Sequence, residues 1–143
     1  MKIVEAGGFA VVGRAARTSN AKEMSGQGAI PKLWMSMPPD RGRIALYAEY
    51  ESDEHDAYTF VLGSKAGQGL SAGAGMVMKK VPRGRYAVFT SEQGPIRKVV
   101  VETWMKIWAM TEYERNFVAD YEVHDERTAD PDNAIVDIYV GVK

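Results

Sequence analysis

Apolar and polar residues alternate in several stretches of the chain, and this pattern predicts β-strands. Residues 2–18 alternate and carry β-branched side chains, with a bend expected at the glycine pair Gly7-Gly8. Two alternating runs within residues 43–65 flank an acidic turn and predict a hairpin. Further strands are predicted at residues 76–92, 117–126 and 134–143.

A helical repeat of apolar residues predicts a first helix after residue 18. Asn20 and Glu23 have the spacing of a capping box, which marks a helix start. The apolar stripe ends at Pro38-Pro39. Pro31 lies inside the segment, so we expect a kink or a restarted helix there, because proline removes a backbone donor.

The clearest helical pattern covers residues 96–108. Proline follows Gly94 at a position that the first turn of a helix tolerates. Apolar side chains then recur at spacings of three and four residues, which places them on one broad face. We expect this face to be buried. A connector rich in Gly, Ser and Ala, at about residues 63–75, separates this part of the chain from the first hairpin.

The order of strand, helix and hairpin occurs twice, which predicts an internal duplication. Tyr47 of the first half aligns with Tyr121 of the second, and other short blocks align in the same order. The sequence therefore predicts one α+β domain, residues 1–143, with pseudo-repeats at about 1–68 and 74–143. Each repeat would be a strand-helix-strand-strand unit, and the two would share an antiparallel sheet with two main helices over one face.

One carboxylate, Glu122, lies on the second face of the strand predicted at residues 117–126. In the register of the repeat, this face aligns with Leu46, Ala48 and Tyr50, which would not usually face solvent. We therefore expect helices to cover Glu122, and burial to raise the pKa of its carboxyl until a bound cation restores the charge. A solvated carboxylate at a sheet edge is the alternative, because short alternating runs are easily misregistered by one residue.

Composition and charge exclude several classes of function. The formal net charge is -1, so the chain lacks the basic excess of nucleic-acid-binding proteins, and we expect no direct DNA binding. The sequence contains neither a run of about 18 apolar residues nor a signal peptide, which predicts a cytoplasmic protein without membrane contact. The chain has no cysteine, which removes disulfides, thiolate nucleophiles and Cys-ligated zinc.

Short motifs that could indicate a metal or a cofactor are interpreted as structural. The acidic turn at residues 52–56 and the His-Asp-Glu run at 124–126 each offer one histidine among carboxylates, which is typical of solvated turns and strand ends. Residues 67–72 fit a dinucleotide-binding pattern, but the segment after them is predicted to be a strand instead of a helix. We therefore expect no metal and no cofactor.

Four segments resemble the GyrI-like effector-binding domains: residues 29–37, 81–89, 120–126 and 137–143. These domains occur in AraC-type and MerR-type multidrug regulators and as free-standing proteins, including integron-cassette proteins. The resemblance covers nearly the whole chain. It implies the duplicated fold predicted above, with a ligand groove between the two helices. It also implies ligands that are often lipophilic cations, and it makes Glu122 the key acidic residue.

The ligand that the resemblance implies needs aromatic walls for its body and a desolvated negative group for its charge. Glu122 would supply that group. Ordinary core packing is the alternative for Trp34 and Trp104. His124 departs from the family, in which many members have an aromatic residue at this position, and related folds make it a minor candidate for a haem ligand. The candidate walls and neighbours of Glu122 are Trp34, Tyr50, Trp104, Trp108, His124 and Tyr139.

Two functions from different classes follow. The first, which we favour, is a stand-alone module that binds or sequesters a small ligand, or signals through a separate regulatory protein. The second, implied by members of this family that resemble hydrolases, is an enzyme acting on reactive natural products. In that case Glu122 would be a general base on water, with Tyr139 or a tryptophan assisting. Inhibition of a topoisomerase by protein contact, also known in the family, is a third option.

Overall fold

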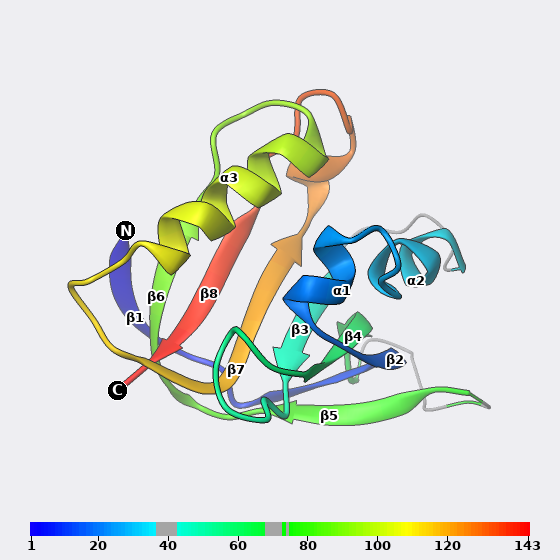
Figure 1. The fold of residues 1–143 in the computed structure, drawn as a ribbon, viewed down its shortest axis with the longest axis horizontal. Helices are drawn as coiled ribbons and strands as arrows, with labels where there is room; N and C mark the ends of the chain where they lie inside the picture. The colour runs from blue at the N-terminus through cyan, green and yellow to red at the C-terminus, as the bar shows by residue number, and fades with distance from the viewer. Residues whose placement is uncertain (37–42, 68–72, 74) are drawn as a thin grey trace.

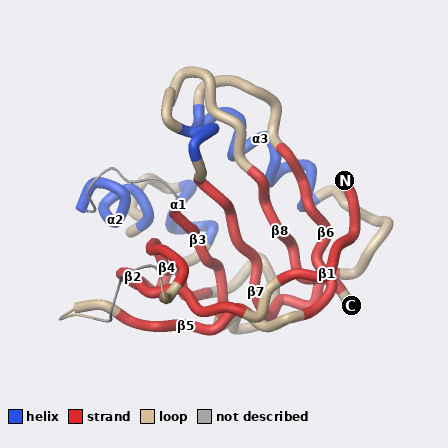
Figure 2. Tube along the Cα trace, turned by 180° about the vertical axis from the view of Figure 1, so that it is seen from behind, coloured by secondary structure: helices blue, strands red, loops and turns tan. Residues whose placement is uncertain are grey.

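The computed structural model describes residues 1–36, 43–67, 73 and 75–143. In chain order its elements are β1 (Lys2–Ala6), β2 (Phe9–Thr18), α1 (Asn20–Met24), α2 (Ile30–Ser36), β3 (Arg43–Ala48), β4 (Tyr58–Lys65), β5 (Val77–Val81), β6 (Gly84–Thr90), α3 (Ile96–Trp108), β7 (Arg115–His124), a 3-10 turn η1 (Glu126–Thr128) and β8 (Asp137–Val142). The strands form one antiparallel sheet in the order β1-β6-β8-β7-β3-β4-β2-β5. The α-helices in these ranges lie on the same face of this sheet (Figure 1, Figure 2), which confirms the predicted α+β class.

β1 and β2 form one arm of a long bent two-stranded ribbon, and β5 and β6 form the other arm. The bend lies at the glycine pair, as predicted. β1 pairs with β6 and β2 pairs with β5, and the register that places Lys2 opposite Val88 continues through both pairs without a shift. The bend falls at Gly7 and Gly8, whose φ angles are 82° and 76°. A Cβ at Gly7 would lie 2.0 Å from the carbonyl oxygen of Pro82, so only glycine fits where the two arms of the ribbon cross.

The segment at residues 76–92, predicted as one strand, is two strands, because the chain bends at Pro82-Arg83 between β5 and β6. The ends of the ribbon join opposite sides of the sheet: β6 pairs with β8, whereas β2 pairs with β4. Between them lie two hairpins, β3–β4 and β7–β8, which pair with each other through β3 and β7. One hairpin falls in each predicted pseudo-repeat, and the superposition of the two repeats stays a prediction.

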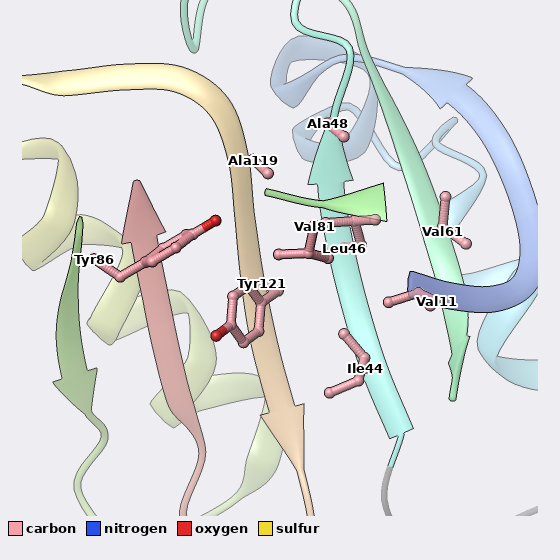
Figure 3. Close-up of a cluster of buried hydrophobic side chains, with 9 residues drawn as sticks. All are labelled: Val11, Ile44, Leu46, Ala48, Val61, Val81, Tyr86, Ala119 and Tyr121. Atoms are coloured by element: carbon pink, nitrogen blue, oxygen red, sulfur yellow. The ribbon is translucent and has the colours of Figure 1, made fainter. Parts of the chain in front are cut away.

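The sheet face opposite the helices carries a buried apolar cluster (Figure 3), which we call the ribbon-side cluster. It combines side chains from the bent ribbon with side chains from the central strands, so it joins the ribbon to the rest of the sheet. Full burial of one such aliphatic side chain contributes roughly 1.5–3 kcal/mol. The buried members are Val11, Ile44, Leu46, Ala48, Val61, Val81, Tyr86, Ala119 and Tyr121.

The N-cap of the first helix, α1, lies one residue earlier than predicted. Ser19 is the N-cap, and its side chain accepts a hydrogen bond from the backbone N–H of Lys22. The predicted capping box between Asn20 and Glu23 is therefore wrong: Asn20 is already the first helical residue, and the backbone N–H of Glu23 donates to the carbonyl oxygen of Ser19 at 3.0 Å instead of to the Asn20 side chain. Asn20 instead donates from its side chain to the carbonyl oxygen of Glu54 at 3.1 Å.

Glu23 joins α1 to α2. Its carboxylate accepts hydrogen bonds from the backbone N–H groups of Ala29 (2.9 Å) and Ile30 (3.3 Å), which are unpaired donors at the start of α2. A negative charge at a helix N-terminus is also favourable for the helix dipole. The helix therefore restarts at Ile30, directly before Pro31, as the proline predicted.

The third helix, α3, buries the face that the apolar repeat predicted. Its buried residues are Val99, Thr103, Trp104 and Ile107. Trp104 and Ile107 pack against Val136, Ile138 and Val140 on the helix side of the sheet. Neither α3 nor any other helix in the described ranges is long and apolar enough to cross a membrane.

Two predictions fall on segments outside the described residues. The predicted end of the first helical region at Pro38-Pro39 is one of them. The other is the dinucleotide-binding pattern at residues 67–72, of which only Gly67 is described. The connector predicted at about 63–75 begins after Lys65, the last residue of β4.

Candidate functional site

Glu122 is buried on the helix side of the sheet, with only 3% of its surface exposed. Its Oε2 atom accepts hydrogen bonds from the Tyr47 hydroxyl at 2.6 Å and from the Trp104 indole N–H at 2.8 Å. Its Oε1 atom lies 2.8 Å from Nε2 of His124. Three different elements, β3, α3 and β7, thus supply polar partners to one carboxylate. The expected burial of Glu122 is confirmed.

The alignment of the repeat, from which this burial was predicted, is wrong about which residues share the face of Glu122. Glu122 lies opposite Ala45 in the pairing of β3 with β7. Leu46 and Ala48, which the repeat placed on the same face as Glu122, belong to the ribbon-side cluster together with Tyr121. Neighbouring residues on a strand point to opposite faces of the sheet. The predicted alignment of the two repeats is therefore shifted by one residue relative to the alignment that would match their faces.

The pKa of Glu122 is lowered, not raised as the sequence predicted. Burial alone raises it, but the hydrogen bond and the charge of His124, with the hydrogen bonds from Tyr47 and Trp104, outweigh burial. The protein itself therefore stabilises the ionised carboxylate without a bound ligand. Burial and the neighbouring charge of Glu122 also raise the pKa of Tyr47 well above its usual value, so this hydroxyl remains a donor.

A pocket of about 290 Å³ lies between α1 and α3, above β3 and β4. Glu122 does not line it, but two of its hydrogen-bond donors, Tyr47 and Trp104, do. The rings of these two residues meet edge to face, with centroids 5.0 Å apart. The aromatic side chains that line the pocket are Tyr47, Tyr50, Tyr58, Trp104 and Trp108.

A second buried carboxylate, Asp120, lies two residues before Glu122 and is fully buried. It accepts hydrogen bonds from the Arg115 guanidinium (Nη2, 2.7 Å), from the Tyr50 hydroxyl, and from the backbone N–H of Gly141 (2.9 Å). Arg115 reaches this position because β7 is irregular between Arg115 and Asp120, where Phe117 has a φ of 53°. Arg115 also lines the pocket, so the two buried carboxylates lie close to the same hollow.

The other ionised groups at the pocket are acidic. Glu23 and Glu54 both line it. Glu23 is engaged at the start of α2, as described above. The carboxylate of Glu54 is 27% exposed and lies 4.0 Å from Nη1 of Arg115. With Asp120 and Glu122 behind the wall, negative charges outnumber positive ones around this pocket.

The structure brings together most of the predicted site residues. Tyr50, Trp104 and Trp108 line the pocket, and Trp108 lies at its exposed edge with 37% of its surface accessible. His124 lies behind the pocket wall, against Glu122. Trp34 packs on the His124 ring at a centroid distance of 4.8 Å and does not line the pocket.

Tyr139 lies away from this group. Ile138 and Val140 point toward α3, so the alternation of β8 directs Tyr139 to the opposite face. There its ring stacks on Tyr121 with centroids 4.6 Å apart and planes 6° from parallel. The prediction that Tyr139 lines the same site as Glu122 is therefore corrected.

Sequence reasoning missed Tyr47, Tyr58, Glu54 and Arg115. Tyr47 was missed because the repeat aligned it with Tyr121, on the face opposite Glu122, whereas in the structure it shares the face of Ala45 and Glu122. Arg115 gave no signal in the sequence, since it reaches the pocket only through the irregularity in β7. A bulge of this kind depends on the pairing with β8 and not on a local pattern.

The acidic turn between β3 and β4 groups Asp53, Glu54 and His55, each with one potential ligand atom, within 4.8 Å of one another. The imidazole of His55 is 80% exposed and lies 3.1 Å from the Asp53 carboxylate. Such groups are common in exposed acidic turns that hold no ion. The interpretation of this segment as a solvated turn stays a prediction.

The fold and the buried acidic site place the chain among effector-binding proteins of the type that its sequence resembles. It belongs to the Cass2 family of integron-associated effector binding proteins, whose family model matches residues 2–142. This confirms the resemblance on which the site prediction rested.

Two known proteins of similar sequence and a third of similar fold can be compared with this chain. The chain is 36% identical over 144 residues to YobU of Bacillus subtilis (strain 168), whose name describes a candidate transcriptional regulator; the match covers 92% of this chain and 90% of YobU. The integron cassette protein VCH_CASS2 from the mobile metagenome of Vibrio cholerae superposes with a TM-score of 0.80 at 27% identity, over 99% of this chain and 95% of that one. SAV2435, solved with bound tetraphenylphosphonium, has the same fold, with a TM-score of 0.70 at 16% identity over 99% and 93% of the two chains.

Proposed function

We propose that the pocket between α1 and α3 binds a lipophilic cation with an aromatic body, and that the protein acts as a stand-alone module that binds or sequesters an effector. One observation carries this proposal: five aromatic side chains surround a hollow whose wall is backed by the ionised carboxylate of Glu122. Membership of an effector-binding family supports it. So does the tetraphenylphosphonium bound by SAV2435, a protein with the same fold.

The arrangement suits a cation that makes no direct contact with Glu122. Tyr47 and Trp104 stand between the carboxylate and the pocket and donate their polar hydrogens away from the ligand, toward Glu122. A ring that donates to an anion becomes richer in electron density, which strengthens its attraction for a cation at its face. The charge of Glu122 also acts through a wall of low dielectric, where it is weakly screened.

None of these observations favours the hydrolase alternative, and we do not propose it. A general base needs a lone pair within reach of a water molecule. Both carboxylate oxygens of Glu122 already have polar partners, and its lowered pKa makes it a weaker base. Tyr139, the predicted assistant, lies on the other face of the sheet. The predicted regulatory partner protein and the predicted lack of DNA binding stay predictions.

A matched pair of ions tests the proposal. Tetraphenylphosphonium and tetraphenylborate have nearly the same shape and opposite charge. Calorimetry at physiological salt should detect saturable binding of the cation and at least about tenfold weaker binding of the anion, because ionised carboxylates dominate the pocket. Equal binding of the two ions, or no binding of the cation, would contradict the proposal.

Tryptophan fluorescence locates the bound cation. Trp108 lines the pocket at its exposed edge, whereas Trp34 packs on His124 outside it. The quenching of tryptophan fluorescence by a bound ligand should be partly lost in Trp108→Phe. It should be retained in the control Trp34→Phe. The reverse pattern would place the ligand near α2 instead of between α1 and α3.

A further inference from the structure

Arg115 lies at the boundary between two hollows. A second pocket, of about 530 Å³, lies next to the first, between the end of α3 and the start of β7. Arg115, Glu54 and Trp108 line both pockets. A ligand seated among the aromatic rings of the first pocket therefore has the guanidinium of Arg115 and the second hollow within reach.

The guanidinium is buried but only partly satisfied. Arg115 is 9% exposed, and its Nη2 atom donates to Asp120 at 2.7 Å. Its Nε and Nη1 atoms have no hydrogen-bond partner in the described part of the chain. The carboxylate of Glu54, 4.0 Å from Nη1, is beyond hydrogen-bond distance. Buried N–H donors without an acceptor are unfavourable, and both atoms are closed to solvent, so a ligand acceptor is favourable for them where the side chains at the boundary of the two hollows make room for it.

The surrounding charges decide which kind of acceptor fits. Asp120 neutralises the guanidinium, and Glu54 adds a second negative charge next to it. A fully charged anion would be repelled by these carboxylates, whereas an uncharged oxygen would not. A neutral carbonyl oxygen can accept from the free donors and keep the charge balance unchanged.

We propose that Arg115 recognises an uncharged oxygen acceptor, such as a ketone, ester or amide carbonyl, on a ligand whose aromatic cationic body occupies the first pocket. This inference rests on the proposed function and narrows its ligand class. Aromatic cations that carry a carbonyl bind more tightly than cations of equal shape that lack one. The competing outcome is that the two donors stay unpaired when a ligand binds, and the test separates the two.

Two tetraarylphosphonium ions that differ in one substituent provide the test. One carries a para-acetyl group on a single ring, and the other carries a para-isopropenyl group, which has the same shape but no oxygen. Calorimetry on the native protein should show about tenfold tighter binding of the acetyl compound, the range expected for a hydrogen bond to a charged donor. In Arg115→Lys, which keeps a positive charge for Asp120, the preference should fall below about twofold because the rigid donor fork is lost.

The matched control is Lys143→Met. Lys143 is a positively charged residue that lines the second pocket only, and its ammonium pairs with Glu114 at 62% exposure. Its removal should leave the preference for the acetyl compound unchanged. Thermal melting of each variant checks that it is folded.

A second measurement on the native protein keeps the inference testable if Arg115→Lys does not fold. The Nε–H resonance of Arg115 should shift further downfield with the acetyl compound than with the isopropenyl compound, since ring currents and charge act equally in both and only the acetyl group accepts a hydrogen bond. Equal affinity of the two ions, or equal resonance shifts, would overturn the role of Arg115 and leave the proposed cation site standing. No binding of either ion would overturn both. A preference that persists in folded Arg115→Lys would assign the acceptor to another group and overturn the inference.

Discussion

The two faces of the sheet bury different kinds of side chain. The ribbon-side cluster is apolar and aromatic, with Leu46 and Val61 fully buried. The helix face also contains apolar clusters, but it buries Glu122 and Asp120 among them, each with several hydrogen-bond partners from separate elements. A hollow lies beside these carboxylates. Burial alone thus does not distinguish core from site, whereas buried charge next to a cavity does.

The largest effect is expected from the apolar face. Leu46→Ala should lower the free energy of unfolding by about 2–5 kcal/mol, because it removes a fully buried side chain and leaves a cavity. The affinity of the remaining folded protein for tetraphenylphosphonium should not change. Urea denaturation measures the free energy of unfolding, and calorimetry on the folded variant measures the affinity. A selective loss of affinity at native stability would mean that the two faces are coupled.

The charged face should respond in the opposite way. Glu122→Gln keeps the size of the side chain and removes its charge, so tetraphenylphosphonium should bind about 1–2 kcal/mol more weakly, a loss of about 5- to 30-fold, because it loses the through-space attraction of a weakly screened charge. A neutral ligand such as triphenylphosphine oxide should lose much less. Isothermal calorimetry with both ligands makes the comparison.

The matched control for this variant is Glu102→Gln, which removes an exposed carboxylate from α3. It should leave both affinities unchanged. Were the cation and the neutral ligand weakened equally by Glu122→Gln, the carboxylate would act only by holding Tyr47 and Trp104 in place.

A smaller effect is expected in the response to acid, because burial of Glu122 offsets part of its hydrogen bonding. Its folded-state pKa is lowered, so its ionisation stabilises the fold above the unfolded-state value of about 4.3. This contribution is lost as the pH falls through the folded-state pKa. The stability difference between the native protein and Glu122→Gln should therefore shrink between neutral pH and about pH 3. Thermal melts across that range test it, and a difference that grew with acid would reverse the sign of the shift.

The smallest effect is expected at Tyr139. Tyr139→Phe keeps the ring that stacks on Tyr121 and lies on the face away from the pocket. Its affinity for tetraphenylphosphonium should stay within about 0.5 kcal/mol of the native value. A larger loss in the same calorimetric assay would place Tyr139 in the ligand site after all.

Much of the fold could be predicted because its signals are local. Alternation located the strands, the glycine pair located the bend, and the apolar repeat located α3 with its buried face. The two errors in the boundaries of elements, at Pro82 and at Ser19, have a common cause. Pro82 divides a run whose alternation continues through the bend, and Ser19 replaces Asn20 as the cap. In both cases a backbone geometry, and not the pattern, decides which residue ends an element.

The site was harder to predict because it is assembled across elements. Glu122 was found, and its burial follows from cover by α3, yet its lowered pKa depends on donors from β3 and α3 that no single segment reveals. Tyr139 was misplaced by the one-residue ambiguity of strand faces. Arg115 was missed because a bulge in β7 directs it to the pocket.

The bent ribbon has a consequence for how the chain folds. β1 and β2 pair with strands that lie roughly 60 to 90 residues away along the sequence, so a large loop must close before any of these contacts form. The hairpins β3–β4 and β7–β8 need only local contacts. Pairings of long range slow folding, so we expect both hairpins to form before the ribbon closes and before β3 pairs with β7, which joins residues equally far apart in the sequence. During synthesis, the first strand to leave the ribosome would thus wait for a partner encoded in the second half of the chain.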